Sequence, residues 1–236
     1  MHDFFKYVRD CLSNRGIARF YPSFMKEVSC YEKYIDSHPD VQATNRVSTQ
    51  EYFVAKIIVP EFGHFSLIWD VSKILKDLPM YSLQPVSVPI ASELVYYDPS
   101  NVSQERVMQY AMHPTKQPIL LVWIEFIQKY YVIDGNHRCT ACRMSNVDMI
   151  KGIILPAQVH LKYMTTDESR QRYKIFHNIA IMSNIANHPR CVVSETGNER
   201  DALYPITNNK LKISLFRHFC LRIYWLLTPR RMRLQA

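Results

Sequence analysis

Five consecutive residues hold the side chains best suited to chemistry: Asp134-Gly135-Asn136-His137-Arg138. They join an apolar, strand-like segment to a segment typical of a helix, and a glycine at such a turn lets the backbone approach an anion closely. The free N–H groups of the first helical turn and the helix dipole favour negative charge there. Arg138 adds a planar fork for two phosphate oxygens, and His137 adds a donor that titrates near neutral pH. The pattern predicts a phosphate-binding turn.

The same spacing fits a purely structural interpretation equally well. Asp134 and Arg138 are four residues apart, so the carboxylate could pair with the guanidinium. Asp134 could also cap the helix that follows, because a short acidic side chain accepts from the N–H groups of a first turn. The residues alone leave both interpretations open.

A second short motif, one strand earlier, suggests a family. Taken with Gly135, His137, Arg138 and Ala141, the segment Gln117-Pro118-Ile119 resembles the nucleotide-binding core of the ParB/sulfiredoxin superfamily. The resemblance covers approximately residues 84 to 160. It implies an α+β fold in which a small mixed sheet is flanked by N-terminal and C-terminal helices, and a nucleotide held by Gln117, Gly135, Asn136, His137 and Arg138.

The sulfiredoxin branch of this superfamily is not supported. Sulfiredoxins have a Gly-Cys-His-Arg turn whose cysteine is the nucleophile, and position 136 is asparagine here. Cys139 cannot replace it, because three residues along a helix turn the side chain by about 300°. Cys139 and Cys142 are instead interpreted as buried thiols rather than a redox or metal pair.

The partition-protein branch binds CTP and DNA, and its signature continues with a Glu-Asn-x-x-Arg segment. Glu168-Ser169-Arg170-Gln171-Arg172 is an imperfect match with serine in place of asparagine. The residues that follow show no paired recognition helices, so a clamp on DNA is not indicated.

A third branch contains small kinases and nucleotide hydrolases with an Asp-Gly-His-His-Arg turn, which differs from residues 134–138 at one position. This resemblance implies ATP- or CTP-dependent phosphotransfer or hydrolysis, with Arg138 as the phosphate clamp, His137 as a catalytic donor and an unidentified hydroxyl acceptor. Asp134 is the candidate ligand for Mg²⁺. The catalytic base would be Glu93, Asp98 or Glu105, and we favour Asp98 because it precedes the helix expected beside the site.

The elements expected around this turn alternate between strand and helix over residues 84–165, which predicts an α+β domain. Strands are expected at 86–90, 118–124, 130–133 and 149–155, and helices at 103–112 and 136–145. Residues 1–83 are predicted to be a helical extension, including a helix at 50–59 that contains no chemistry. Residues 166–236 are predicted to be helical with a basic end.

Charge and cysteine content limit the class of protein. The net charge is +8, and the last acidic residue is Asp201, so seven of the eight excess charges lie beyond it. The tail 210–236 could therefore contact nucleic acid or an anionic surface, or be a solvated end. The first ten residues lack the apolar core of a signal peptide and no segment predicts a membrane span, so a cytoplasmic protein with reduced thiols is expected.

Three functions follow from these observations. The preferred one is a nucleotide-dependent phosphotransferase or hydrolase acting at residues 134–138. The first alternative is a DNA-binding or nuclease protein related to partition proteins, suggested by the basic tail. The second alternative is a catalytically silent interaction module, suggested by the asparagine at position 136.

Overall fold

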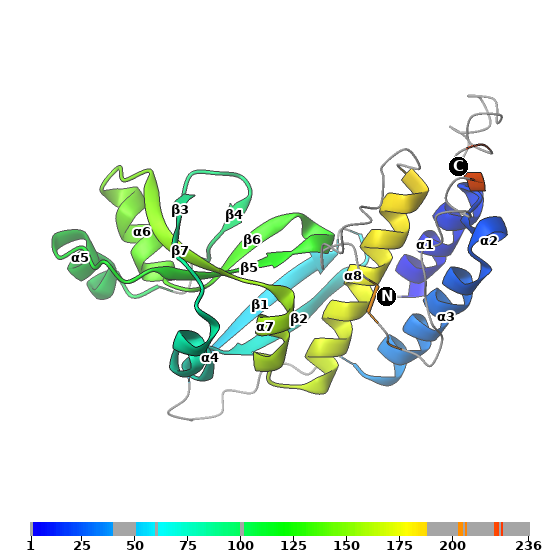
Figure 1. Ribbon diagram of the computed structural model, residues 1–236, viewed down its shortest axis with the longest axis horizontal. Coiled ribbons are helices and arrows are strands. Elements are labelled where there is room, and N and C mark those ends of the chain that lie inside the picture. The colour runs from blue at the N-terminus through cyan, green and yellow to red at the C-terminus, as the bar shows by residue number, and fades with distance from the viewer. Residues whose placement is uncertain are drawn as a thin grey trace. The chain divides into compact units, whose positions relative to one another are not determined.

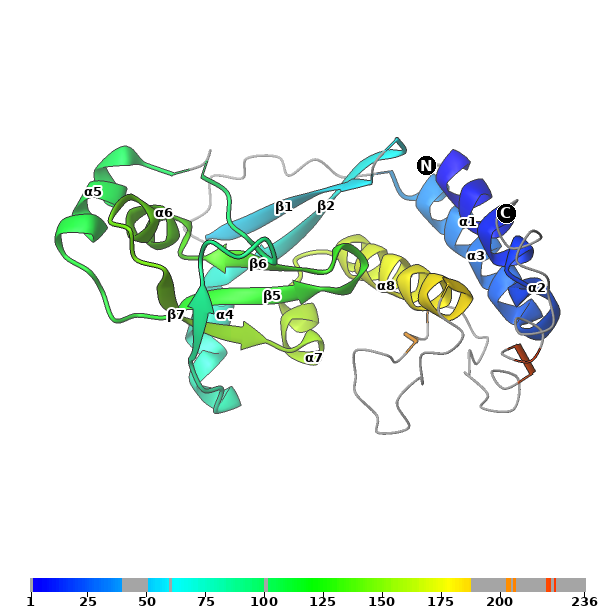
Figure 2. The ribbon, with the colours of Figure 1, turned by 90° about the horizontal axis from the view of Figure 1, so that it is seen from above.

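The predicted helices at the N-terminus form where apolar residues recur at helical spacing. A computed structural model of the chain describes residues 2–39, 51–59, 61–99, 102–187, 203–204, 206, 220–221 and 223. Helices α1 (His2–Asn14), α2 (Ile17–Phe20) and α3 (Pro22–Ser37) lie side by side (Figures 1 and 2). The buried residues of α3 are Phe24, Glu27, Val28, Tyr31 and Ile35. Four of these five, all but Glu27, are hydrophobic and recur at helical spacing.

The helix predicted at residues 50–59 is wrong, because this segment is strand β1 (Tyr52–Val59), which pairs with β2 (Gly63–Asp70). Burial alternates along the strand, with Ala55 and Ile57 inside and Lys56 and Ile58 outside. Aromatic and β-branched residues favour such a pleated, half-buried surface. Gly63, at φ 109°, begins the second strand after the turn.

Packing divides the chain into two units. The first contains residues 1–41, 57–65 and 170–236, and the second contains residues 42–56 and 66–169. The predicted core, 84–165, lies within the second unit. Helix α8 (Asp167–Asn187) follows this core, and Phe176 on α8 stacks on Phe65 with ring centroids 4.2 Å apart.

The second unit is built on a mixed five-stranded sheet, and the fold class is α+β as predicted. The strand order is β3-β7-β5-β6-β4, with β5 parallel to β7 and antiparallel to β6. The bounds of these strands are β3 Val86–Pro89, β4 Val95–Tyr96, β5 Ile119–Ile124, β6 Lys129–Asp134 and β7 Met149–Leu155. The two-residue edge strand β4 was not predicted, because it is too short to show a period.

The two helices that position the site are α5 (Gln104–Met112) and α6 (Asn136–Met144), which pack against each other. Beneath α6 lies an apolar cluster whose buried members are Val88, Ile90, Ile119, Leu121, Val132 and Cys139. The remaining short elements of this unit are α4 Val71–Asp77, η1 Leu78–Tyr81, η2 Glu125–Ile127, α7 Ala157–His160 and η3 Leu161–Tyr163. Since β6 ends at Asp134 and α6 starts at Asn136, the chemistry-bearing residues lie on a strand-to-helix turn with a single connecting residue.

Candidate functional site at the start of helix α6

The turn between β6 and α6 depends on Gly135. Its φ of 103° lies in the left-handed region, and it is the N-cap of α6 without any side-chain cap. A Cβ at this position would lie 2.4 Å from Cγ2 of Ile119 and 3.0 Å from Nη2 of Arg138. Glycine is therefore required both by the backbone conformation and by the close approach of β5. The expected capping of the helix by Asp134 is absent, so that part of the structural interpretation is wrong.

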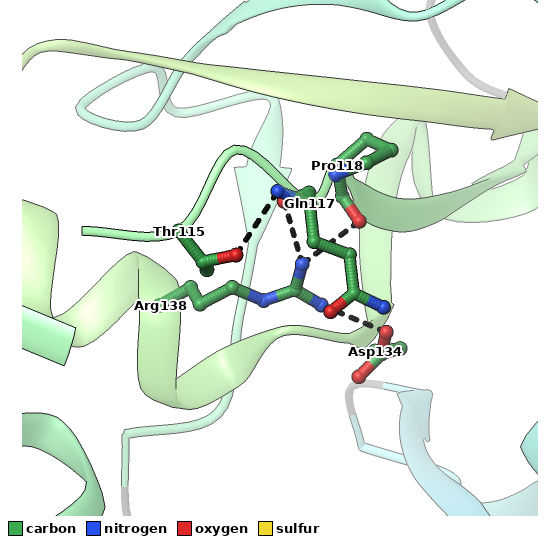
Figure 3. A network of polar contacts seen from close by, with 5 residues as sticks. All are labelled: Thr115, Gln117, Pro118, Asp134 and Arg138. Carbon is green, nitrogen blue, oxygen red and sulfur yellow. Dashed lines mark hydrogen bonds and ion pairs between the residues drawn. The ribbon is translucent and has the colours of Figure 1, made fainter. Parts of the chain in front are cut away.

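Arg138 is held by internal contacts on both terminal nitrogens (Figure 3). Nη1 donates to the main-chain oxygens of Gln117 at 2.7 Å and Pro118 at 2.9 Å, and Nη2 donates to Oδ2 of Asp134 at 2.8 Å. The residue is only 6% exposed. The pairing of Asp134 with Arg138, expected from their spacing, is confirmed. The guanidinium is consequently not the free phosphate clamp that the resemblance implied, because its terminal nitrogens already hold the β6–α6 turn to the start of β5.

Asp134 and Gln117 belong to the same network. The Asp134 side chain is 18% exposed, and its Oδ2 is the atom that pairs with Arg138. Gln117 contributes its main-chain oxygen, and Figure 3 shows its side-chain amide pointing toward the Asp134–Arg138 pair. Among the described residues, the group with the geometry of three metal ligands is His2, Glu32 and Asp36, which lies in the other unit. Asp134, the predicted Mg²⁺ ligand, therefore belongs to no group of three ligands among the described residues, and its carboxylate is already paired with the Arg138 guanidinium.

Asn136 connects the turn to the segment before α5. Its Oδ1 accepts from the backbone N–H of Asp98 at 3.0 Å, and its main-chain oxygen accepts from the Thr140 hydroxyl at 2.9 Å. This contact brings Asp98 next to the first turn of α6. The two other candidate bases lie elsewhere, with Glu93 lining a separate cavity of about 380 Å³ and Glu105 exposed on α5.

His137 accepts a hydrogen bond on one ring nitrogen, since the backbone N–H of Ser103 donates to Nε2 at 3.0 Å. An accepting Nε2 places the proton of the neutral ring on Nδ1, which is then a donor. Burial and the positive charge of Arg106 lower the pKa of His137, against the smaller opposing effects of Glu51 and Asp134. The imidazole is therefore held neutral in the physiological range, with one donor left for a ligand.

The first turn of α6 has unused donors. Intrahelical bonding begins with the N–H of Cys139, which donates to the oxygen of Gly135 at 2.9 Å. Within the described residues, no hydrogen bond is recorded from the backbone N–H groups of Asn136, His137 and Arg138. This is the arrangement in which a helix N-terminus receives an anion.

The cysteines of α6 do not take part in the chemistry of the turn. Burial raises the pKa of the Cys139 thiol to about 12, with a smaller effect of Cys142, and burial also raises the pKa of Cys142. Because the thiolate is the reactive form, Cys139 is inert at neutral pH. The interpretation as buried thiols is confirmed for Cys139, whereas Cys142 is partly exposed.

Sequence reasoning missed the hydrogen bond that Ser103 makes in this site. It also missed a cavity of about 470 Å³ that is lined in part by α6. Ser103 caps α5, with its hydroxyl accepting from the N–H of Arg106 at 3.5 Å, while its own N–H fixes the ring of His137. Serine before a helical segment was the available signal for the cap. The cavity gave no signal, because its lining comes from three separate elements.

No family model, curated protein or solved structure is significantly similar to this chain. None of the helices in the described part of the chain is long and apolar enough to cross a membrane. The basic tail predicted at 210–236 lies outside the described residues except for Cys220, Leu221 and Ile223.

Proposed function

We propose that this protein binds a nucleoside triphosphate, ATP or CTP, with its phosphates at the start of α6. The observation that carries the proposal is the set of backbone N–H groups of residues 136–138, which donate to no described residue and follow a left-handed glycine. Beside them, the neutral ring of His137 keeps a donor on Nδ1. Backbone donors of this kind cost no reorganisation when an oxyanion binds. The resemblance of residues 117–141 to nucleotide-binding turns supports the same choice of ligand.

In this proposal Arg138 is a positioning residue. It ties the oxygens of Gln117 and Pro118 to Asp134 and so fixes the direction in which the first-turn N–H groups point. A single carboxylate that is already paired with a guanidinium does not fit a protein-held Mg²⁺, which prefers oxygen ligands in a full octahedral set. We therefore derive no step through a metal ion.

The reaction we propose is phosphoryl transfer to a hydroxyl group or to water. The acceptor oxygen attacks the terminal phosphorus, the bond from that phosphorus to the bridging oxygen breaks, and Asp98 takes the proton of the acceptor. The position of Asp98 is set by its backbone N–H, which donates to Asn136. The His137 Nδ1–H donates to a non-bridging oxygen as negative charge develops there.

Binding is tested by calorimetry with ATP and CTP on the wild type, His137→Asp and Arg143→Gln. Both substitutions lower the net charge by one at neutral pH, but Arg143 is an exposed residue in the last turn of α6. We expect the carboxylate at position 137 to weaken nucleotide binding at least about tenfold through repulsion at the anion site, and the control to bind as the wild type does. No binding by the wild type, or equal loss in both variants, would contradict the proposal.

The proton acceptor is tested separately with Asp98→Asn. We expect nucleotide binding to persist while phosphate release and transfer to a hydroxyl acceptor fall by about a hundredfold, the lower end of what general base catalysis contributes. Turnover that is unchanged in this variant would remove Asp98 from the mechanism and leave the binding proposal standing.

A second candidate is a catalytically silent interaction module, and the internal engagement of Arg138 favours it. A guanidinium whose terminal nitrogens are bonded to the protein adds no charge to a ligand site. This candidate predicts a folded protein that binds neither nucleotide and whose stability falls when the network is broken. The calorimetry described above distinguishes the two candidates.

A further inference from the structure

A cavity of about 470 Å³ lies along the C-terminal half of α6, in the second unit. We name it the α5–α6 groove, and the lining residues that matter here are Tyr110, Lys116, Ala141, Cys142, Val147 and Lys151. Helices α5 and α6 and strand β7 lie side by side in both views (Figures 1 and 2). Its volume is in the range of small-molecule sites, which are typically 300 to 1,000 Å³.

The groove has an apolar floor and an apolar rim. Ala141 is 2% exposed and contributes to the floor, whereas Val147 is 43% and Met149 46% exposed. Large apolar side chains that remain exposed around a pocket indicate a binding surface, because a bound ligand covers them and removes their apolar area from water. In the described part of the chain, no other element covers Val147 and Met149.

The charge on the groove has one sign. Lys116 and Lys151 both line it and are both exposed, and no acidic residue is among the described residues of its lining. No hydrogen bond or ion pair is recorded for either amine within the described part of the chain. Arg138 also reaches the lining, but its guanidinium is held by Asp134, so the two lysines supply the available positive charge.

We infer that the α5–α6 groove binds a small amphipathic carboxylate, with its aliphatic chain on the Ala141 and Val147 surface and its carboxylate at Lys116 and Lys151. Apolar contact supplies most of the affinity, because each methylene group that the ligand buries is removed from water. The two amines, at the mouth of the groove, select an anion over a neutral or cationic molecule of equal length. The groove shares Arg138 with the first turn of α6, but the proposed carboxylate does not use the backbone N–H groups of that turn, and the inference does not depend on the proposed nucleotide function.

The groove can be tested with decanoate, using decanol and decyltrimethylammonium as neutral and cationic probes of equal chain length. We expect decanoate to bind more tightly than decanol and the cation to bind most weakly. Equal binding of all three probes would show unspecific apolar adsorption and overturn the inference.

Two variants locate the binding. Lys116→Met combined with Lys151→Met should weaken decanoate binding about three- to tenfold and leave decanol unchanged, since two partly solvated ion pairs are lost. Lys73→Met is the matched control, because Lys73 is an exposed lysine on α4 outside the groove. Val147→Glu places a carboxylate at the rim and should lower the affinity for decanoate further. An unchanged affinity in both groove variants contradicts the proposed site.

Cys142 gives a readout that needs no variant. Its side chain lines the groove and is partly exposed, whereas Cys30 is an exposed thiol in the other unit. Alkylation by iodoacetamide, followed residue by residue by mass spectrometry, should slow at Cys142 when decanoate is present and stay constant at Cys30. Equal rates at Cys142 with and without decanoate, or binding only of an acidic peptide and not of decanoate, would reject the small-molecule assignment.

Discussion

The two ends of helix α6 differ in what their polar groups do. At the N-terminal end the charged side chains are bonded to the protein, since Arg138 holds Asp134 and two main-chain oxygens. The side chain of Ile119 leaves no room there for a Cβ at position 135. At the C-terminal end Cys142 is partly exposed and the neighbouring cavity is open. The difference teaches that the charged residues of a motif can stabilise the fold, so that the backbone beside them, or the groove that begins at Arg138 and continues along α6, remains for a ligand.

The largest expected effect is a difference in the free energy of unfolding between alanine variants of Arg138 and Arg143, the arginines at these two ends. Arg138→Ala leaves a mostly buried carboxylate and two carbonyl oxygens without their donor, so we expect the free energy of unfolding to fall by about 3 to 5 kcal/mol. Arg143→Ala should leave the free energy of unfolding nearly unchanged, because its bond to the Tyr97 hydroxyl is long, at 3.4 Å, and exposed. Urea unfolding followed by circular dichroism measures both values.

The origin of the loss can be separated with a second substitution. Adding Asp134→Asn to Arg138→Ala removes the unpaired charge, so part of the lost stability should return. If Arg138→Ala were as stable as Arg143→Ala, the network would be a surface feature and the contrast between the two ends of α6 would be incorrect.

The glycine and the asparagine that flank α6 give the next contrast. Both have positive φ, 103° at Gly135 and 53° at Asn146. Gly135→Ala combines left-handed strain of about 1 to 2 kcal/mol with overpacking against Ile119 of about 1 to 3 kcal/mol. Asn146 is exposed, so Asn146→Ala should show only the strain. Thermal and urea unfolding of the two variants should therefore differ by at least about 1 kcal/mol, and equal losses would mean that Ile119 yields to the added methyl group.

Local rules predicted most of the sheet and of the helices that surround the site. Residues 119–124 form a continuous apolar run that indicated a buried strand, and the helix at 136–144 followed from the glycine and the polar first turn. The strand at 52–59 was missed because a short apolar segment does not by itself distinguish a strand from a helix. Pairing with residues 63–70 decides between the two periods, and such pairing is not visible in a short window.

The sequence predicted which residues form the site but not all of the hydrogen bonds between them. The five residues of the turn and Asp98 do lie together, and the pairing of Asp134 with Arg138 was one of two interpretations of their spacing. The sequence could not show that Nη1 of Arg138 donates to the main-chain oxygens of Gln117 and Pro118. That contact depends on the register of β5 beside β6. Main-chain oxygens have no sequence signal at all.

The smallest effect concerns His137 and the pH dependence of the N-terminal end. Its pKa is lowered from the ordinary value of 6.5, by burial first and by Arg106 second, with Glu51 and Asp134 acting in the opposite direction. The unfolded chain then binds a proton more readily than the folded chain, so this stabilising contribution is complete above pH 6.5 and is lost as the pH falls below it.

His137→Gln keeps an oxygen to accept the Ser103 N–H but cannot be protonated. The variant should therefore show a flatter dependence of the urea midpoint on pH between about pH 5 and 7, the range in which histidine titrates, while its stability at pH 8 stays close to that of the wild type. A wild-type slope that persists in the variant would assign the pH dependence to other groups.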